Sequence, residues 1–281
     1  MNKKQKFFAY PYVVWMFIFI VFPIVLVFLY SITTKEVNNI KTINFTLNNY
    51  KLFFDPLYIG VTIRSINLAL VSTIFCLVLG YPIAYIISKI NVKNRNTVLL
   101  LFILPMWMNM LLRTYAWMTI LGNNGIINNF LNMLGFPSLR LLYNNSAIII
   151  GMVYNFLPFM VLPIYTALSK MDQNLVEASH DLGADNRTTF LKVILPLSLP
   201  GVISGIIMVF MPAVSSFVIP RLLGGNRSLY IGTLIENLFL VTGDWNFGSA
   251  VAIMMMLIIL VSMSILNKFD VDKEGGGSNL W

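Results

Sequence analysis

Charged side chains are scarce in this sequence. Asp, Glu, Lys and Arg together make up 11% of its 281 residues, whereas hydrophobic residues make up 58%. In ordinary soluble domains the charged fraction is about 25%. The composition therefore excludes an ordinary soluble domain.

Residue types that carry chemistry are few as well. The chain has one cysteine, Cys76, and one histidine, His180, so it can form no internal disulfide and offers no His, Asp or Glu spacing suited to a metal or to acid–base catalysis. We expect His180 to lie on a solvated helix face. No Gly-x-x-x-x-Gly-Lys-Ser/Thr segment occurs, which excludes an ATP-binding phosphate loop. Energy must therefore come from a partner or from an ion gradient.

Long apolar windows dominate what is present. Six windows of 19 to 25 residues occur, and a spanning helix requires about 20 residues. They are Phe7–Tyr30, Asn67–Ile87, Thr97–Leu121, Ala147–Leu168, Pro200–Pro220 and Gly248–Leu266. Only the third contains a charge, Arg113. The sequence therefore predicts an all-α membrane protein with six transmembrane helices, forming one domain over residues 1–269, with a flexible Gly-rich tail at 270–281.

The net charge of +8 does not indicate nucleic acid, because the basic residues are scattered and form no patch with stacking aromatics. Placing the N-terminus in the cytoplasm puts eleven of the Lys and Arg residues on that side. The positive-inside rule then favours an N-in, C-in orientation.

A charged and patterned stretch, Lys170–Pro200, separates the fourth and fifth windows; we call it the elbow. Asp172 can cap a first helix that ends at Gly183, and Asp185 or Asn186 can cap a second helix leading to Pro196. The first helix would carry one apolar face, formed by Leu175, Ala178 (or Ser179) and Leu182. N-in orientation puts this elbow in the cytoplasm.

Polar and helix-breaking residues interrupt several windows. Pro105 and Asn109 disturb the third window, where Arg113 either faces the bundle interior or snorkels to the outer interface. We expect Pro158 and Pro163 to kink or break the fourth helix. Gly201 and Gly205, four residues apart in the fifth window, permit close helix packing, and 121–145 reads as a Gly/Asn-rich external loop.

The elbow resembles the EAA motif of ABC importer permeases. The matching residues are Glu177-Ala178-Ser179, Gly183, Val193, Leu195 and Pro196. Ser179 replaces the second Ala of the motif, and Val193 replaces an Ile. The resemblance implies that the elbow is a coupling helix that docks on a separate ATP-hydrolysing subunit. Glu177 would then meet a basic residue of that subunit, while Ala178, Ser179 and Gly183 stay small to fit its cleft.

Further segments are similar to the spermidine/putrescine subfamily of these permeases. They are Pro105-x-Trp107-x-Asn109, 113–117 (RTYAW), 217–225 (FVIPRLLGG) and 244–250 (DWNFGSA). The resemblance implies a bacterial inner-membrane protein that pairs with a second permease subunit as a heterodimer. It also implies two copies of an ATP-binding subunit, which hold ATP and Mg²⁺, and an extracytoplasmic binding protein; this chain itself would hold no cofactor. Arg221 stands where some relatives carry an acid.

A polyamine pathway would need carboxylates and aromatic faces for its ammonium groups. The candidates are Arg113, Tyr115, Trp117, Glu236, Asp244 and Trp245. Alternatively, the aromatics form an interfacial belt and the acids face water.

Two other functions stay open. An ABC permease could carry another small solute, such as thiamine or ferric iron. A secondary transporter driven by H⁺ or Na⁺ would want ionisable residues near the midplane and an internal repeat, and this chain offers only Arg113 within a window.

Overall fold

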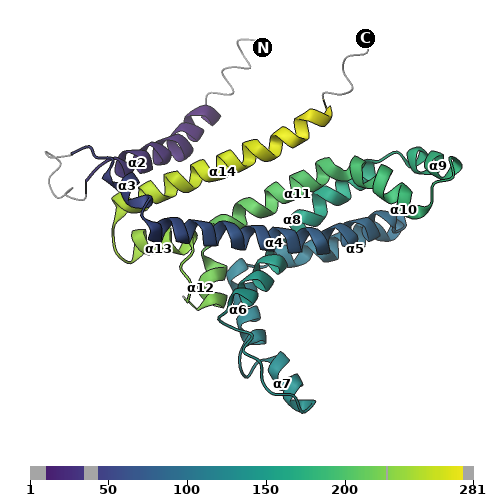
Figure 1. The fold of residues 1–281 in the computed structure, drawn as a ribbon, viewed down its shortest axis with the longest axis horizontal. Helices are drawn as coiled ribbons and strands as arrows, with labels where there is room; N and C mark the ends of the chain where they lie inside the picture. The colour runs from purple at the N-terminus through teal and green to yellow at the C-terminus, as the bar shows by residue number, and fades with distance from the viewer. Residues whose placement is uncertain (1–10, 35–43, 226, 275–281) are drawn as a thin grey trace, which may run out of the picture. The chain divides into compact units, whose positions relative to one another are not determined.

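The computed structural model describes residues 11–34, 44–225 and 227–274, and this part of the chain is almost entirely helical (Figure 1). Its single β element is an isolated bridge between Thr33 and Phe45. The chain divides into two compact units. Unit 1 comprises residues 1–62 and 234–260, and unit 2 comprises 63–233 and 261–281.

The predicted spans are present as helices. Five helices of the described residues are long and apolar enough to cross a membrane, and a bent pair makes a sixth. The five are Pro11–Ser31, Pro56–Lys89, Asn145–Lys170, Asn186–Ser215 and Trp245–Leu266, and the pair is Lys93–Trp107 with Met110–Met133. Each of the six predicted windows overlaps one of these spans. The prediction of a helical membrane protein is therefore confirmed, with five spans as single helices and six if the bent pair counts as one span.

Unit 1 contains the first span and the beginning of the last. Three whole elements belong to it: η1 (Phe17–Val21), α2 (Phe22–Ser31) and α3 (Asn48–Phe53). It also includes most of α13 (Ile231–Leu240) and the first half of α14 (Trp245–Glu274). Buried Asn246 of α14 joins these parts, since its amide donates to Tyr30 O, Thr33 O and Thr33 Oγ1 at 2.8–3.0 Å. Carbonyl groups at and just after the C-terminal end of α2, which have no partner within that helix, thereby receive hydrogen bonds from α14.

Unit 2 contains the middle spans. Its elements are α4 (Pro56–Lys89, from residue 63 on), α5 (Val92–Ile103), η2 (Leu104–Trp107), α6 (Met110–Leu121), α7 (Ile126–Met133), α8 (Asn145–Lys170), α9 (Gln173–Asp181), α10 (Asn186–Thr189), η3 (Phe190–Ile194), α11 (Leu195–Ser215) and α12 (Val218–Gly224). Helices α8 and α11 are in extensive contact. The Gly201–Gly205 prediction is confirmed, because a Cβ at Gly201 would lie 2.6 Å from Ala167 Cβ and one at Gly205 would lie 2.8 Å from Met160 Sδ.

The structure shows where the predicted spans are interrupted. Helix α8 runs unbroken through Pro158 and Pro163, so the expected alternative of a break is wrong, whereas the alternative of a kink stays a prediction. In an apolar medium a continuous helix satisfies more backbone groups than a broken one. The third window instead breaks at Met108 and Asn109, where extended backbone lets the Asn109 side chain cap α6 and the axis turns by 90°. The fifth window also breaks, because α11 ends at Ser215 and α12 follows.

Two further differences concern connections and ends. The expected loop at 121–145 contains a short helix, α7, which the sequence analysis missed because eight residues give too little periodicity. Helix α14 extends to Glu274, and the rest of the predicted tail, 275–281, lies outside the described residues.

Candidate functional site

The first helix of the elbow, α9, has the two ends that the sequence predicts. The carboxylate of Asp172 accepts a hydrogen bond from Asn174 N at 3.0 Å and caps its N-terminus. At the other end Gly183 has φ +83°, Gly183 N donates to His180 O at 2.8 Å, and Ala184 N donates to Ser179 O at 3.0 Å. This pair of bonds is the Schellman arrangement, which requires a left-handed residue and therefore favours glycine.

The turn into the second helix is fixed by side chains. Asp185, rather than Asn186, caps α10, because its Oδ1 accepts from Thr188 N at 3.1 Å. Hydrogen bonds from Thr188 hold the pKa of the exposed Asp185 carboxyl below its ordinary value. His180 is exposed, as expected, and its Nδ1 lies 3.0 Å from Ala184 O across the same turn.

The two helices of the elbow are clamped together by hydroxyl groups. Ser179 Oγ lies 2.9 Å from Thr189 Oγ1 and donates to Val176 O at 2.7 Å. Thr189 is buried, so the clamp is shielded from water. Ser179, one of the two residues at which this sequence departs from the EAA pattern, therefore closes the elbow in addition to being small.

The outer surface of α9 is left open by the rest of the described chain. Glu177 and Ala178 are exposed, and so are Leu175 and Leu182, the latter by 89%. No described residue forms an ion pair with Glu177. An exposed carboxylate beside an apolar stripe is a surface suited to docking on a protein.

The elbow is connected to the spans through Phe190. This residue begins the π turn η3, and its ring lies edge-on to Tyr81 and Tyr85 of α4, with centroids 5.8 and 5.6 Å away. Tyr81 Oη is also 2.8 Å from Ser198 Oγ of α11. Displacement of the elbow would therefore move α4 and α11 together.

The π turn has a local cause in the sequence. Leu195 N donates to Phe190 O, five residues earlier, directly before Pro196. A proline ring clashes with the carbonyl four residues before it, and widening the preceding turn relieves that clash. The same combination occurs in unit 1, where η1 precedes Pro23 and Phe22 N donates to Phe17 O.

Three candidate pathway residues share helix α6 of unit 2. Trp117 packs edge-on against Tyr154 of α8, with centroids 5.4 Å apart. Tyr115 is exposed. Arg113 is half-buried, and its Nε is a buried atom with no hydrogen-bond partner among the described residues.

The other three candidates belong to unit 1. Glu236 is half-buried on α13. Asp244 Oδ1 accepts from Phe247 N at 3.3 Å, so Asp244 also has the structural role of capping α14. Trp245 packs against Tyr30 and Phe239, with centroids 6.2 and 5.4 Å away.

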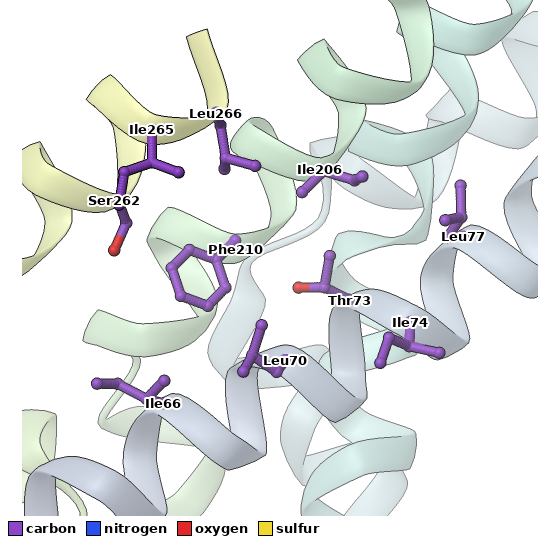
Figure 2. Close-up of a pocket in the computed structure, with 10 residues that line it drawn as sticks. All are labelled: Ile66, Leu70, Thr73, Ile74, Leu77, Ile206, Phe210, Ser262, Ile265 and Leu266. Carbon is purple, nitrogen blue, oxygen red and sulfur yellow. The ribbon is translucent and has the colours of Figure 1, made fainter. Parts of the chain in front are cut away.

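In the described part of the chain no metal site accompanies these residues, and the groove that Trp117 helps to line is mainly apolar. No group of three or more His, Cys, Asp or Glu residues in the described ranges could hold a metal ion. A groove of about 400 Å³ in unit 2 is lined by apolar side chains and two hydroxyls (Figure 2). Its lining residues are Ile66, Leu70, Thr73, Ile74, Leu77, Ile206, Phe210, Ser262, Ile265 and Leu266. Without a carboxylate, this groove does not offer the ion pairing that a polyamine needs.

Sequence reasoning missed the residues that join the elbow to the spans. Tyr81 and Tyr85 are four residues apart and therefore share a face of α4, which is a detectable signal. Their partner Phe190 lies more than a hundred residues further along the chain. Nothing in a single sequence connects the two.

Comparison with known proteins gives a consistent result. Residues 77–271 match the family described as "Binding-protein-dependent transport system inner membrane component". The spermidine/putrescine transport system permease protein PotB of Haemophilus influenzae is 41% identical over 266 residues, covering 92% of this chain and 93% of that protein. PotB of Escherichia coli is 40% identical over 263 residues, covering 90% of this chain and 96% of that protein.

Solved structures share the fold. A bacterial ABC transporter involved in the import of alginate superposes with a TM-score of 0.79 at 18% identity, covering 95% of this chain and 96% of that chain. The methionine ABC transporter MetNI gives a TM-score of 0.57 at 16% identity, covering 77% and 97%. With its elbow, its helical spans and these likenesses, the chain belongs to the family of binding-protein-dependent transport system inner membrane components, and it is a multi-pass protein of the bacterial inner membrane.

Proposed function

We propose that this chain is a permease subunit of an ATP-driven importer and forms part of the translocation path for spermidine and putrescine. The elbow carries the proposal. It presents Glu177 and an apolar stripe outward, it is closed by the Ser179–Thr189 contact, and it joins α4 through Phe190. A rigid element of this kind can pass motion from a partner to the spans.

The substrate class rests on the named relatives. The PotB proteins of H. influenzae and E. coli are named for spermidine/putrescine transport, and their similarity to this chain extends over at least 90% of its length. On this proposal Arg113, Tyr115, Trp117, Glu236, Asp244 and Trp245 line or flank the pathway. The aromatic faces and the two acids would bind ammonium groups.

The proposal also specifies partners and orientation. Two ATP-binding subunits supply ATP and Mg²⁺, a second homologous permease subunit completes the path, and an extracytoplasmic binding protein delivers the substrate. This chain holds no cofactor of its own and hydrolyses no ATP. Both termini and the elbow lie in the cytoplasm, where the ATP-binding subunits are.

Uptake of labelled spermidine and putrescine into liposomes tests the proposal. The liposomes contain this chain copurified with its native partners, and excess unlabelled thiamine or ferric iron serves as competitor. We expect uptake that requires ATP and ignores both competitors. Uptake driven by an ion gradient without ATP would contradict the proposal, whereas ATP-driven uptake of thiamine or iron would contradict only the substrate.

A matched pair of variants isolates the elbow. Glu177→Gln removes the carboxylate that we assign to docking, and Asp181→Asn makes the same change of charge one helical turn later on exposed α9. We expect Glu177→Gln to lower uptake and substrate-stimulated ATP hydrolysis at least tenfold, because a buried charge pair would lose one partner. Asp181→Asn should stay within twofold of the unmodified complex, and equal losses in both variants would argue against the assignment.

A further inference from the structure

The connection between α6 and α8 has a polar interior. Asn128 of α7 is fully buried, with 0% of its surface exposed. Its amide donates to Gly122 O and Leu139 O at 3.0 Å, and its Oδ1 accepts from Leu139 N at 2.8 Å. This one asparagine therefore joins the segment before α7, at Gly122, to the segment after it, at Leu139.

Glycines fix the two ends of the same segment. A side chain at Gly125 would collide with the carbonyl oxygens of Thr119, Ile120 and Gly122, so this entrance to α7 accepts only glycine. At the exit Gly135 has φ +82°, and Gly135 N donates to Asn132 O at 3.1 Å. The connection is therefore a built structure rather than a loose loop.

One face of this structure is apolar and exposed. Its side chains are Ile126, Phe130, Met133, Leu134 and Phe136, each between 56% and 82% exposed. The first three recur at i, i+4 and i+7, which places them on one face of α7. An apolar face of this kind is unfavourable in water, so it needs a cover.

The direction of the segment points to the cover. The run Met110–Met133, which comprises α6 and α7, makes an angle of 90° with Lys93–Trp107 before it. Figure 1 shows α7 leading away from α4, α5 and α8, whereas α6, which precedes it, contacts α8 and α12. If α5 follows the membrane normal as part of a span, α6 and α7 run in the plane of the membrane.

The position of the segment agrees with that direction. Helix α7 is separated from the end of α6 by only Gly122–Gly125, and α8 begins at Asn145 and ends beside the elbow. Four residues reach about 14 Å at most, so α7 begins close to the end of α6. The chain after α7 leads to the start of α8, which is the end of that helix opposite the elbow.

The composition of the segment favours lipid, rather than a soluble protein, as the partner that covers the apolar face. Residues 114–139 contain no Asp, Glu, Lys, Arg or His. A surface that docks and releases a soluble protein usually surrounds its apolar centre with a polar, charged rim. Helices that read anionic lipids carry Lys or Arg on the polar face. Two aromatics suited to a headgroup region are exposed nearby, Trp107 at the end of η2 and Tyr115 on α6.

From these observations we propose that α6 and α7 form an interfacial arm, with the face of Ile126, Phe130 and Met133 inserted among the lipids of the leaflet opposite the elbow. Burial of apolar surface holds the arm there, and anionic headgroups are not required. The arm anchors the break in the third span and keeps the start of α8 at the membrane surface.

Spin-label accessibility tests the arm in the complex with its native partners in nanodiscs. Cys76 is first replaced by Ala, and a nitroxide is then attached at Met133→Cys or, as the matched control, at Asn132→Cys. Both positions are exposed and adjacent, but Asn132 lies about 100° around the helix, off the apolar face. Retained uptake shows that each labelled complex is folded.

We expect the label at 133 to collide at least threefold more often with dissolved oxygen than with a water-soluble nickel chelate, and the label at 132 to show the reverse. Greater access of nickel at 133 would place the face in water and overturn the proposal. Protection of 133 from both reagents would mean that a protein covers the face, which would overturn it equally.

Lipid composition tests the charge argument separately. Because residues 114–139, which include all of α7, contain no basic residue, the ratio of oxygen to nickel collisions at 133 should be the same in purely zwitterionic discs and in discs with anionic lipid. Insertion seen only with anionic lipid would contradict burial of apolar surface as the cause.

Discussion

At the scale of single residues, buried asparagines organise both units of this permease. Asn128 joins the two ends of its connection in unit 2, and Asn246 joins α14 to the end of α2 in unit 1. An asparagine can donate two bonds and accept others, so one side chain satisfies several backbone groups that no helix satisfies. Both were inconspicuous in the sequence, because Asn is common in its connections.

Asn246→Ala removes three hydrogen bonds from a buried position and leaves Thr33 and Tyr30 carbonyls without this donor. We expect the free energy of unfolding to fall by about 1–3 kcal/mol, the usual cost of an unsatisfied buried group. Thermal unfolding in detergent micelles measures the change. Asn48→Ala, at an exposed site of the same unit, should lower the midpoint hardly at all; equal effects would mean that Asn246 has no special role.

At the scale of elements, the elbow depends on one left-handed residue. Gly183 and Gly60 both have open space around them, so a methyl group added at either position meets no atom within 4 Å. Only Gly183 has a positive φ, at +83°. Comparing an alanine substitution at each position therefore distinguishes the effect of backbone conformation from that of steric collision.

Gly183→Ala should strain the turn between α9 and α10 by about 1 kcal/mol and widen the angle of the elbow. We expect a severalfold loss of ATP-driven uptake at an unchanged yield of folded complex. Gly60→Ala provides the comparison and should transport normally. Uptake that falls equally in the two variants, or in neither, would contradict the claim that the elbow requires the left-handed conformation of Gly183.

The contact between α8 and α11 makes a graded prediction. A Cβ added at Gly201 would lie 2.6 Å from Ala167 Cβ and 2.7 Å from the Pro163 carbonyl oxygen, neither of which can move aside. A Cβ added at Gly205 would come closest to the sulfur of Met160, whose side chain is flexible. Overpacking of a close contact costs about 1–3 kcal/mol. Gly201→Ala should therefore lower the thermal midpoint in micelles more than Gly205→Ala does. The opposite order would contradict the packing described for α11.

At the scale of the whole molecule, the described contacts imply that the elbow acts on the spans through Phe190. Phe190→Ala would remove the ring between η3 and α4 while leaving the outer face of α9 intact. We expect ATP hydrolysis to persist and the uptake per ATP to fall several-fold. Leu191→Ala changes an exposed neighbour and should preserve the ratio. Loss of hydrolysis together with uptake would instead indicate that Phe190 supports folding or docking.

The spans were predictable because about 20 apolar residues have few alternatives to a membrane helix. The caps of the elbow were predictable too, since Asp172, Gly183 and Asp185 act on chain within three residues of themselves. The third window breaks beside Asn109, a residue that the sequence analysis named as disturbing it, whereas the break in the fifth window was not predicted. The contacts of Phe190 join distant segments, which one sequence does not reveal.

The π turn before Pro196 has a consequence for the rotational phase of the fifth span. One extra residue in a helical turn rotates everything that follows by about 100° relative to everything before it. Thr189 faces α9 ahead of this offset, and Gly201 faces α8 beyond it. The number of residues between Thr189 and Gly201 therefore determines the direction in which each of them faces around the helix axis. Adding or removing one residue between them would turn Gly201 and Gly205 away from α8. Adding four residues, about one helical turn, would bring both glycines back close to their original direction.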